Sequence, residues 1–302
     1  MCRLLAYAAA KENKSLKEVL TPEQIEGFLW MSTIHNDGWG AAHMVDASDS
    51  AGIEDGGAPS QETTTSIYRS TESAFLDPLV EAVTAEPARS AIFHLRLATP
   101  GIPLNIENQQ PFSCDGMTFM HNGSIENDEG NILDDYDALA GLGKPETARK
   151  AAENLPVTHE EFERTGGRSD SAIYFATIIK NYEKDGNLVA AVSRTIATLR
   201  EKYPDSSYNS VLQTDDALVF THAVGEGPVS EELGKIYTDN DFAEHIADYR
   251  DIKYRELDDG GVVVASTGFE QPDDEGWKDL ENNTLIAVDT RTGKYRVVAL
   301  GE

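Results

Sequence analysis

The 302-residue sequence is poor in cysteine, in positive charge and in long apolar runs. Two cysteines make no disulfide framework and suit a reducing compartment, so we expect a cytoplasmic protein. No apolar run approaches the roughly 20 residues that a membrane-spanning helix needs, so no membrane partner is expected. Lys and Arg number 25 against 53 Asp and Glu, and the net charge of −28 repels nucleic-acid phosphates. No nucleic-acid partner is therefore expected either.

The sequence also lacks the motifs of several enzyme classes. It contains no Walker A motif, no G-x-G-x-x-G and no G-x-S-x-G. Its seven histidines are scattered, without an H-x-H or H-E-x-x-H pair, and its cysteines are far apart. We therefore predict no metal site and no cofactor.

What the sequence does have is a cysteine directly after the initiator methionine. Removal of Met1 would put the thiol of Cys2 and a free α-amine on the same residue. Such an amine has a pKa of about 7.7–8.0, so near neutral pH it can accept the proton of its own thiol. Taken alone, a cysteine at this position is more often a small residue that begins a buried strand.

The apolar pattern predicts two groups of strands separated by two helices. The first group of expected strands covers residues 2–8, 39–45, 66–70, 91–97 and 117–121. The second group covers 208–212, 218–221, 261–266, 285–288 and 295–300. Helices are expected from Pro22, over 73–85, 170–182 and 188–202, and around 241–249, with an exposed loop at 46–63. This order indicates one α+β domain over residues 1–302.

Two strand ends carry candidate binding groups. Arg96 and Thr99 follow an apolar strand, and a guanidinium there can hold a carboxylate with two hydrogen bonds. A structural ion pair is the alternative interpretation of Arg96. Asn122 and Gly123 end another strand, where an amide and a backbone N–H can form an oxyanion hole. Asn-Gly is also a common hairpin turn.

A third candidate group lies where Gly166 and Gly167 lead into a helix. Asp170 would lie at the N-terminus of that helix and could bind an ammonium group, although Ser169 or Asp170 could be a plain cap. Glutamine carries a carboxylate, an ammonium and an amide. A glutamine hydrolase therefore needs a nucleophile, a carboxylate clamp, an oxyanion hole and an ammonium clamp, and the sequence supplies all four in that order.

This ordered set of motifs resembles the class II glutamine amidotransferases of the N-terminal-nucleophile hydrolase superfamily. The matching segments run through nearly the whole chain: residues 1–5, 37–40, 94–99, 121–123, 169–171, 208–215 and 262–266. The chain is most similar to the stand-alone bacterial subgroup that includes the γ-glutamyl hydrolase of ergothioneine biosynthesis. The resemblance implies an α+β fold, a four-layer αββα sandwich, with the nucleophile at the start of an inner strand.

The resemblance also implies roles for the residues that match the motifs. Cys2 is the implied nucleophile, and Asn122 with Gly123 the implied oxyanion hole. Arg96 and Asp170 would bind the α-carboxylate and α-amino groups of the substrate.

Four further residues complete the implied site. Thr99 and His121 would line the pocket, and Asp37 with Trp39 would support it. The chain departs from many relatives at Gln110, where they carry a histidine, which concerns the acceptor side more than hydrolysis.

The predicted activity is hydrolysis of the γ-amide of glutamine or of a γ-glutamyl compound through a thioester on Cys2. An alternative is a non-catalytic or partner-dependent subunit that binds glutamine or supplies ammonia to a larger amidotransferase complex, with a synthase or hydrolase as partner. Cys114 with His121 as base is a weaker alternative for the nucleophile, because no third orienting group is evident.

Overall fold

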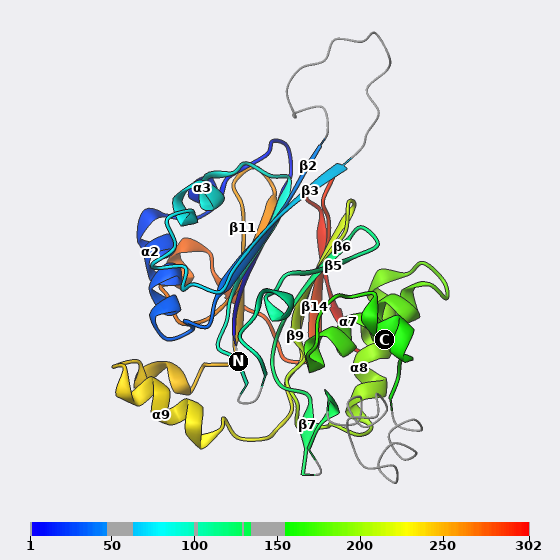
Figure 1. The fold of residues 1–302 in the computed structure, drawn as a ribbon. Coiled ribbons are helices and arrows are strands. Elements are labelled where there is room, and N and C mark those ends of the chain that lie inside the picture. Colours follow the sequence, from blue (N-terminus) through cyan, green and yellow to red (C-terminus); the bar gives the residue numbers. More distant parts are fainter. Residues whose placement is uncertain (1, 47–62, 100–101, 129, 134–154, 302) are drawn as a thin grey trace.

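The computed structural model describes residues 2–46, 63–99, 102–128, 130–133 and 155–301. Two antiparallel sheets lie face to face, and helices cover the outer face of each (Figure 1). The loop expected at 46–63 falls almost wholly outside the described residues. This arrangement confirms the predicted four-layer αββα sandwich.

The first sheet contains seven strands in the order β13-β11-β12-β1-β4-β2-β3. Their bounds are β1 Arg3–Ala9, β2 Trp39–Asp46, β3 Thr63–Ser70, β4 Ser90–Leu95, β11 Ile252–Glu256, β12 Gly261–Ser266 and β13 Lys278–Asp279. The strand that begins the chain, β1, is therefore in the middle of its sheet. It pairs with β4 on one side and with β12, near the other end of the sequence, on the other.

The second sheet contains six strands in the order β15-β14-β10-β9-β6-β5. Their bounds are β5 Phe112–Cys114, β6 Met117–Asn122, β9 Asn209–Gln213, β10 Ala217–His222, β14 Thr284–Asp289 and β15 Tyr295–Ala299. A small ribbon of β7 (Glu126–Asn127) and β8 (Gly130–Asn131) follows β6. Ten of these strands across the two sheets match strands expected from the sequence.

The helices form two outer layers. The first sheet is covered by α1 Leu16–Val19, α2 Pro22–Trp30, α3 Val80–Ala85 and α9 Glu231–Asp239. The second sheet is covered by α6 His159–Glu163, α7 Asp170–Tyr182 and α8 Leu188–Arg200. Four short 3₁₀ turns complete the described elements: Met31–Thr33, Ile106–Asn108, Ala243–Ile246 and Asp273–Glu275.

Side-chain alternation in β1 divides the protein interior between two layers. Leu4, Ala6 and Ala8 pack between the sheets, whereas Leu5 and Tyr7 pack against the helices. A strand side chain points to the same face as its neighbour two residues away. Cys2 therefore falls on the face between the sheets, which is where the second sheet can contact it.

The helix starts follow the capping signals in the sequence. Thr21 accepts a hydrogen bond from the backbone of Gln24 at 3.3 Å, and Pro22 occupies the first turn of α2. Ser169 accepts a hydrogen bond from the backbone of Ala172 at 3.3 Å and caps α7. Both helix starts were predicted, and α7 is buried on nearly all sides.

Two predicted helices differ from the structure. The helix expected over 73–85 begins only at Val80, because Pro78 disfavours helical backbone at Asp77 and the Asp77 carboxylate accepts a hydrogen bond from the Leu79 N–H at 2.9 Å. The helix expected at 241–249 is reduced to the turn Ala243–Ile246. The real helix of this region, α9, lies earlier, after its cap Ser230.

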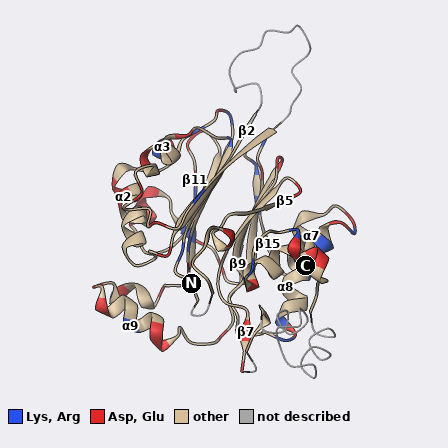
Figure 2. Ribbon diagram, in the orientation of Figure 1, with Lys and Arg blue, Asp and Glu red and all other residues tan. Residues whose placement is uncertain are grey.

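Charged residues are distributed unevenly between the helices and the sheets. Figure 2 shows Asp and Glu on α2, α3 and α9, while the strands of both sheets are largely uncharged. None of the helices that the structure describes is both long and apolar enough to cross a membrane.

Candidate active site

Three strand ends meet at one end of the layer between the sheets. Cys2 directly precedes β1, Arg96 directly follows β4, and Asn122 is the last residue of β6. The antiparallel register pairs Arg3 with Leu95, which places the beginning of β1 beside the end of β4. The structure thus brings together residues that are far apart in the sequence.

Cys2 is fixed by its backbone. It is 6% exposed, and its N–H donates to Asn122 Oδ1 at 2.7 Å. Because a peptide N–H can only donate, this bond sets the orientation of the Asn122 amide and leaves its Nδ2 as the free donor end. Removal of Met1 would convert the same nitrogen into the α-amine of Cys2.

The Cys2 thiol is poised to ionise. Burial raises its pKa, but the amino terminus and His94 both favour the thiolate, and together with a contact from Sγ to the Leu97 carbonyl at 3.9 Å they lower the pKa from 9.0 to about 6. His94 favours the thiolate both electrostatically and as a hydrogen-bonding side chain. A thiolate is the nucleophilic form of cysteine.

Arg96 presents an unsatisfied guanidinium. The residue is 4% exposed, its Nη2 donates to the Pro103 carbonyl at 3.3 Å, and its Nη1 is buried without a partner in the described part of the chain. Burial lowers the pKa of Arg96, while Cys2 and Asp37 oppose that effect. An unpaired buried cation is costly, so Nη1 is suited to an anionic ligand.

Asp37 shapes the loop that carries Arg96. Its N–H donates to the Arg96 carbonyl at 3.0 Å, and its carboxylate accepts from the Ala98 N–H at 2.8 Å. The Gln109 amide donates to the Asp37 carbonyl at 2.7 Å. These bonds connect Asp37 to the loop that follows β4 and to Gln109.

Gly123 must be glycine in this fold. A Cβ at this position would lie 2.2 Å from the Ser207 carbonyl oxygen and 2.6 Å from the His121 ring. The close approach is needed because Ser207 Oγ donates to the Asn122 carbonyl at 2.8 Å. Asn122 and Gly123 are thereby held beside the pocket rather than in a simple hairpin between strands.

On the second sheet, His121 organises a polar wall. Its ring bonds the Ser207 carbonyl through Nε2 at 2.8 Å and Ser171 Oγ through Nδ1 at 2.9 Å. Burial lowers the pKa of His121, so the ring is neutral and the carbonyl requires the proton on Nε2. Nδ1 must then accept the Ser171 proton, which leaves the oxygen lone pairs of Ser171 available.

Asp170 completes the wall at the N-terminus of α7. It is 2% exposed, and its carboxylate accepts from the Ile125 N–H at 2.9 Å and from the Ser171 N–H at 2.8 Å. Asp170 and Ser171 therefore form an acceptor surface suited to an ammonium group.

These groups line one small pocket. Cys2, Arg96, Thr99, His121 and Asp170 all face it, together with Gly123 and Ser171. Its volume of about 30 Å³ is room for about two water molecules. A glutamyl group would therefore require the lining residues to move apart. Among the described residues, no group of three or more His, Cys, Asp or Glu side chains is arranged to hold a metal.

Two residues named from the sequence lie away from the pocket. Trp39 faces the helices on the outer side of the first sheet, where its Nε1 donates to the Asp77 carboxylate at 2.9 Å. It therefore supports the sheet and not the pocket directly. Cys114 lies in β5 opposite Met117, while His121 lies four residues further along β6. That spacing is roughly 13 Å along a strand, too far for His121 to act as base for Cys114.

Comparison with solved structures identifies the fold. A glutamine aminotransferase class-II domain protein from Silicibacter pomeroyi superposes with a TM-score of 0.56 at 15% identity, over 100% of both chains. A glutamine phosphoribosylpyrophosphate amidotransferase from B. subtilis gives 0.53 at 14% identity, over 99% of this chain and 49% of the other. The fold is that of class II glutamine amidotransferase domains.

A third structure, described as the allosteric regulatory enzyme of purine biosynthesis, gives a TM-score of 0.55 at 15% identity, over 99% of this chain and 49% of the other. The chain thus spans about half the length of these two larger proteins. No protein-family model matches the sequence, and no curated protein matches it.

Several residues of the site were not predicted from the sequence. Ser171 was part of a motif but had no role, although the serine two residues after a cap, at a helix N-terminus, was a visible signal. Gln110 was noted only as a departure, yet its Oε1 accepts from the His121 N–H at 2.6 Å. No local sequence pattern indicated a role for Tyr249, because the side chains that contact it come from distant parts of the chain.

Proposed function

We propose that residues 1–302 form one glutamine amidotransferase domain of a cytoplasmic enzyme, which hydrolyses the γ-amide of glutamine or of a γ-glutamyl compound. The observation that carries the proposal is the convergence of three groups on one pocket. The Cys2 thiol has a lowered pKa, the Arg96 guanidinium is buried with Nη1 unpartnered, and the Asp170 carboxylate lies at a helix N-terminus. These groups match the amide, carboxylate and ammonium of a glutamyl substrate.

In this proposal the reaction starts with removal of Met1. The α-amine of Cys2, held by Asn122 Oδ1, accepts the proton of its own thiol. The thiolate attacks the γ-carbonyl carbon, and the oxyanion accepts hydrogen bonds from Asn122 Nδ2 and the Gly123 N–H. One such donor typically contributes about 3–4 kcal/mol to lowering the barrier.

The tetrahedral intermediate then collapses by breaking the carbon–nitrogen bond. The leaving amine takes the proton held by the Cys2 α-amine, and a γ-glutamyl thioester remains on Cys2. Water, deprotonated by the same amine, attacks the thioester and releases glutamate and the free thiol. Arg96 and Asp170 hold the α-carboxylate and α-ammonium of the glutamyl group through both halves of the reaction, with Thr99 and His121 lining the pocket.

The experiment that tests the proposal is a mass-spectrometric map after treatment with 6-diazo-5-oxo-norleucine, a glutamine-like electrophile. We expect an adduct on a peptide that begins at Cys2, formed more slowly when excess glutamine is present. A Cys114→Ala variant should label in the same way, and a Cys2→Ala variant should not label.

The other outcomes are equally informative. An adduct on Cys114 would overturn the assignment of the nucleophile. A chain that retains Met1, forms no adduct and binds glutamine in calorimetry without releasing ammonia would favour the alternative, a glutamine-binding subunit of a larger complex.

A further inference from the structure

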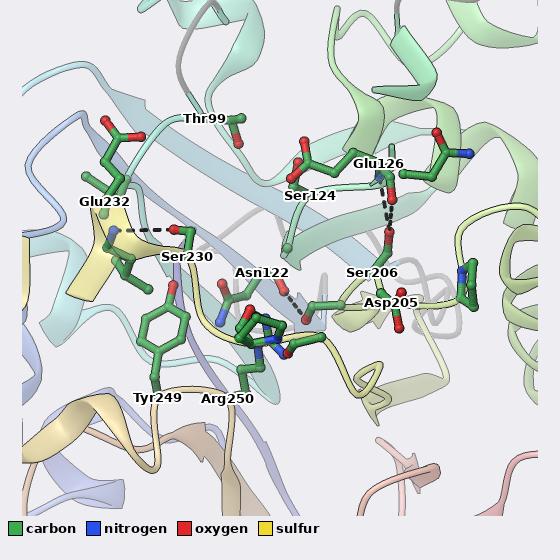
Figure 3. Close-up of a pocket in the computed structure, with 18 of the residues that line it drawn as sticks. Thr99, Asn122, Ser124, Glu126, Asp205, Ser206, Ser230, Glu232, Tyr249 and Arg250 are labelled. Atoms are coloured by element: carbon green, nitrogen blue, oxygen red, sulfur yellow. Dashed lines mark hydrogen bonds between the residues drawn. The ribbon is translucent and has the colours of Figure 1, made fainter. Parts of the chain in front are cut away.

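A second, much larger cavity adjoins the pocket of Cys2. Its volume is about 990 Å³, and Leu97, Ala98, Thr99 and Gly123 line both spaces. Its other walls come from the segment after β6, the segment before β9, the start of α9 and the region of Tyr249 (Figure 3). Ammonia is about as large as one water molecule, which needs roughly 10–15 Å³ of a cavity measured in this way. The cavity is therefore far larger than the leaving group of glutamine requires.

The hydroxyl of Tyr249 is buried beside this cavity without a partner. Tyr249 is 2% exposed, and its Oη has no hydrogen-bond partner in the part of the chain that the structure describes. Figure 3 shows the hydroxyl pointing into the cavity. Because a buried polar group without a partner is costly, such a group in a native fold calls for a ligand or water.

The Tyr249 ring is held firmly in this orientation. Arg3 donates from Nη1 to the Tyr249 carbonyl at 2.7 Å, and its guanidinium carbon lies 4.3 Å from the centre of the ring. Burial raises the pKa of Tyr249 well above its usual value. The phenol is therefore neutral, and it can both donate and accept a hydrogen bond.

Four acidic residues and two basic residues, Lys202 and Arg250, line the cavity, so its walls carry an excess of negative charge. Glu232 lies on one side, and Glu126 and Asp205 on the other (Figure 3). Among the described residues none of the three forms an ion pair. The Arg250 guanidinium of the same cavity donates to the Gly227 and Pro228 carbonyls instead. Acidic residues are common on this protein. These carboxylates are relevant because they line the same cavity as a buried hydroxyl that has no partner among the described residues.

We infer that this cavity binds the amine half of the substrate, which is a γ-glutamyl amide whose leaving amine is polar and positively charged. The inference rests on the proposed function and names its substrate class. The glutamyl half reacts with Cys2 in the small pocket. When the amide carbon–nitrogen bond breaks, the amine takes the proton held by the Cys2 α-amine and leaves through the cavity. Tyr249 bonds its polar group, and the carboxylates attract its charge.

The test is a set of length-matched substrates. The N-γ-glutamyl derivatives of 1,4-diaminobutane, pentylamine and 4-aminobutanoate end in an ammonium, a methyl group and a carboxylate. We expect kcat/KM to fall in that order, by at least about tenfold from the first to the last, and the first to exceed glutamine. The cation preference should shrink as salt is raised, because screening weakens the attraction.

Substitutions in the cavity and a control substitution outside it test whether the cavity itself sets the substrate preference. Tyr249→Phe should lower the ratio of kcat/KM for the diaminobutane amide to that for glutamine by about tenfold. A Glu232→Gln, Asp205→Asn double variant should reduce the preference for ammonium over carboxylate. Tyr254→Phe, at a tyrosine that does not line the cavity, should change neither ratio.

The outcomes distinguish the two proposals. If glutamine is hydrolysed but the three amides react equally, or if Tyr249→Phe leaves the ratio unchanged, the inference is wrong and the proposed function stands. If neither glutamine nor any γ-glutamyl amide is hydrolysed by processed protein, and the diazo reagent does not label Cys2, the proposed function itself fails.

Discussion

The two cysteines are buried in different layers and have opposite chemistry. Cys114 packs in the apolar layer between the second sheet and α7, where burial, and then the neighbouring Asp115 carboxylate, raise its pKa. Cys2 lies at the end of the layer between the sheets, where the amino terminus and His94 outweigh burial and lower its pKa to about 6. Burial alone makes a thiol inert. A nearby positive charge makes a buried thiol reactive.

Replacing each cysteine in turn tests most directly whether the two thiols differ in reactivity. We expect Cys2→Ala to reduce turnover of glutamine by a factor on the order of 10³ or more, because the proposed covalent step has no other nucleophile. Cys114→Ala should keep turnover within about twofold. Ammonia release measures both, and circular dichroism checks that both variants fold. Full activity in Cys2→Ala would show that the thioester mechanism is wrong.

The pH dependence of alkylation measures the difference between the two thiols without any substitution. The thiolate forms as pH rises through the pKa. Iodoacetamide should therefore reach half of its maximal rate on Cys2 near pH 6, and on Cys114 only above pH 9.

At pH 7 the Cys2 thiolate dominates, so its labelling should be at least about tenfold faster than that of Cys114, even though a thiolate of low pKa is intrinsically less nucleophilic. Peptide mass spectrometry over a pH series measures both rates. Equal rates at pH 7 would contradict the electrostatic account of the site.

The smallest expected effect concerns stability. Cys114 packs in a core of large apolar side chains, so Cys114→Ala should lower the free energy of unfolding by about 1 kcal/mol through lost packing. Urea denaturation measures the change. A loss of activity without a loss of stability in this variant would mean that the two cysteines are not divided between reactivity and packing.

Local signals predicted most of the fold. The apolar run of β1, the alternation in β4 and the caps at Thr21 and Ser169 depend only on neighbouring residues, and those elements are confirmed. The prediction failed where a local signal competed with another. Pro78 shortened α3, and the cap at Ser230, followed by acidic residues typical of a first helical turn, was overlooked in favour of the acidic segment after it.

The sequence could predict those residues of the candidate site that belong to short motifs. Arg96 and Asp170 line one pocket with Cys2, and Asn122 accepts a hydrogen bond from the Cys2 backbone. What the motifs could not give was the unpartnered state of Arg96 Nη1 and of Tyr249 Oη. Both depend on which distant segments pack around them, and no spacing in the sequence records that. Trp39, by contrast, lies on the opposite face of its sheet because alternation places it beside Leu95 rather than beside His94.

The central place of β1 has a consequence for the maturation of this protein. One neighbour of β1 is β12, which begins at residue 261, so the middle of the first sheet cannot close until most of the chain has left the ribosome. Until then the amino-terminal residues remain accessible to an aminopeptidase. Once the sheet closes, Cys2 is nearly inaccessible. The removal of Met1 that the proposed function requires would therefore have to occur before the first sheet closes.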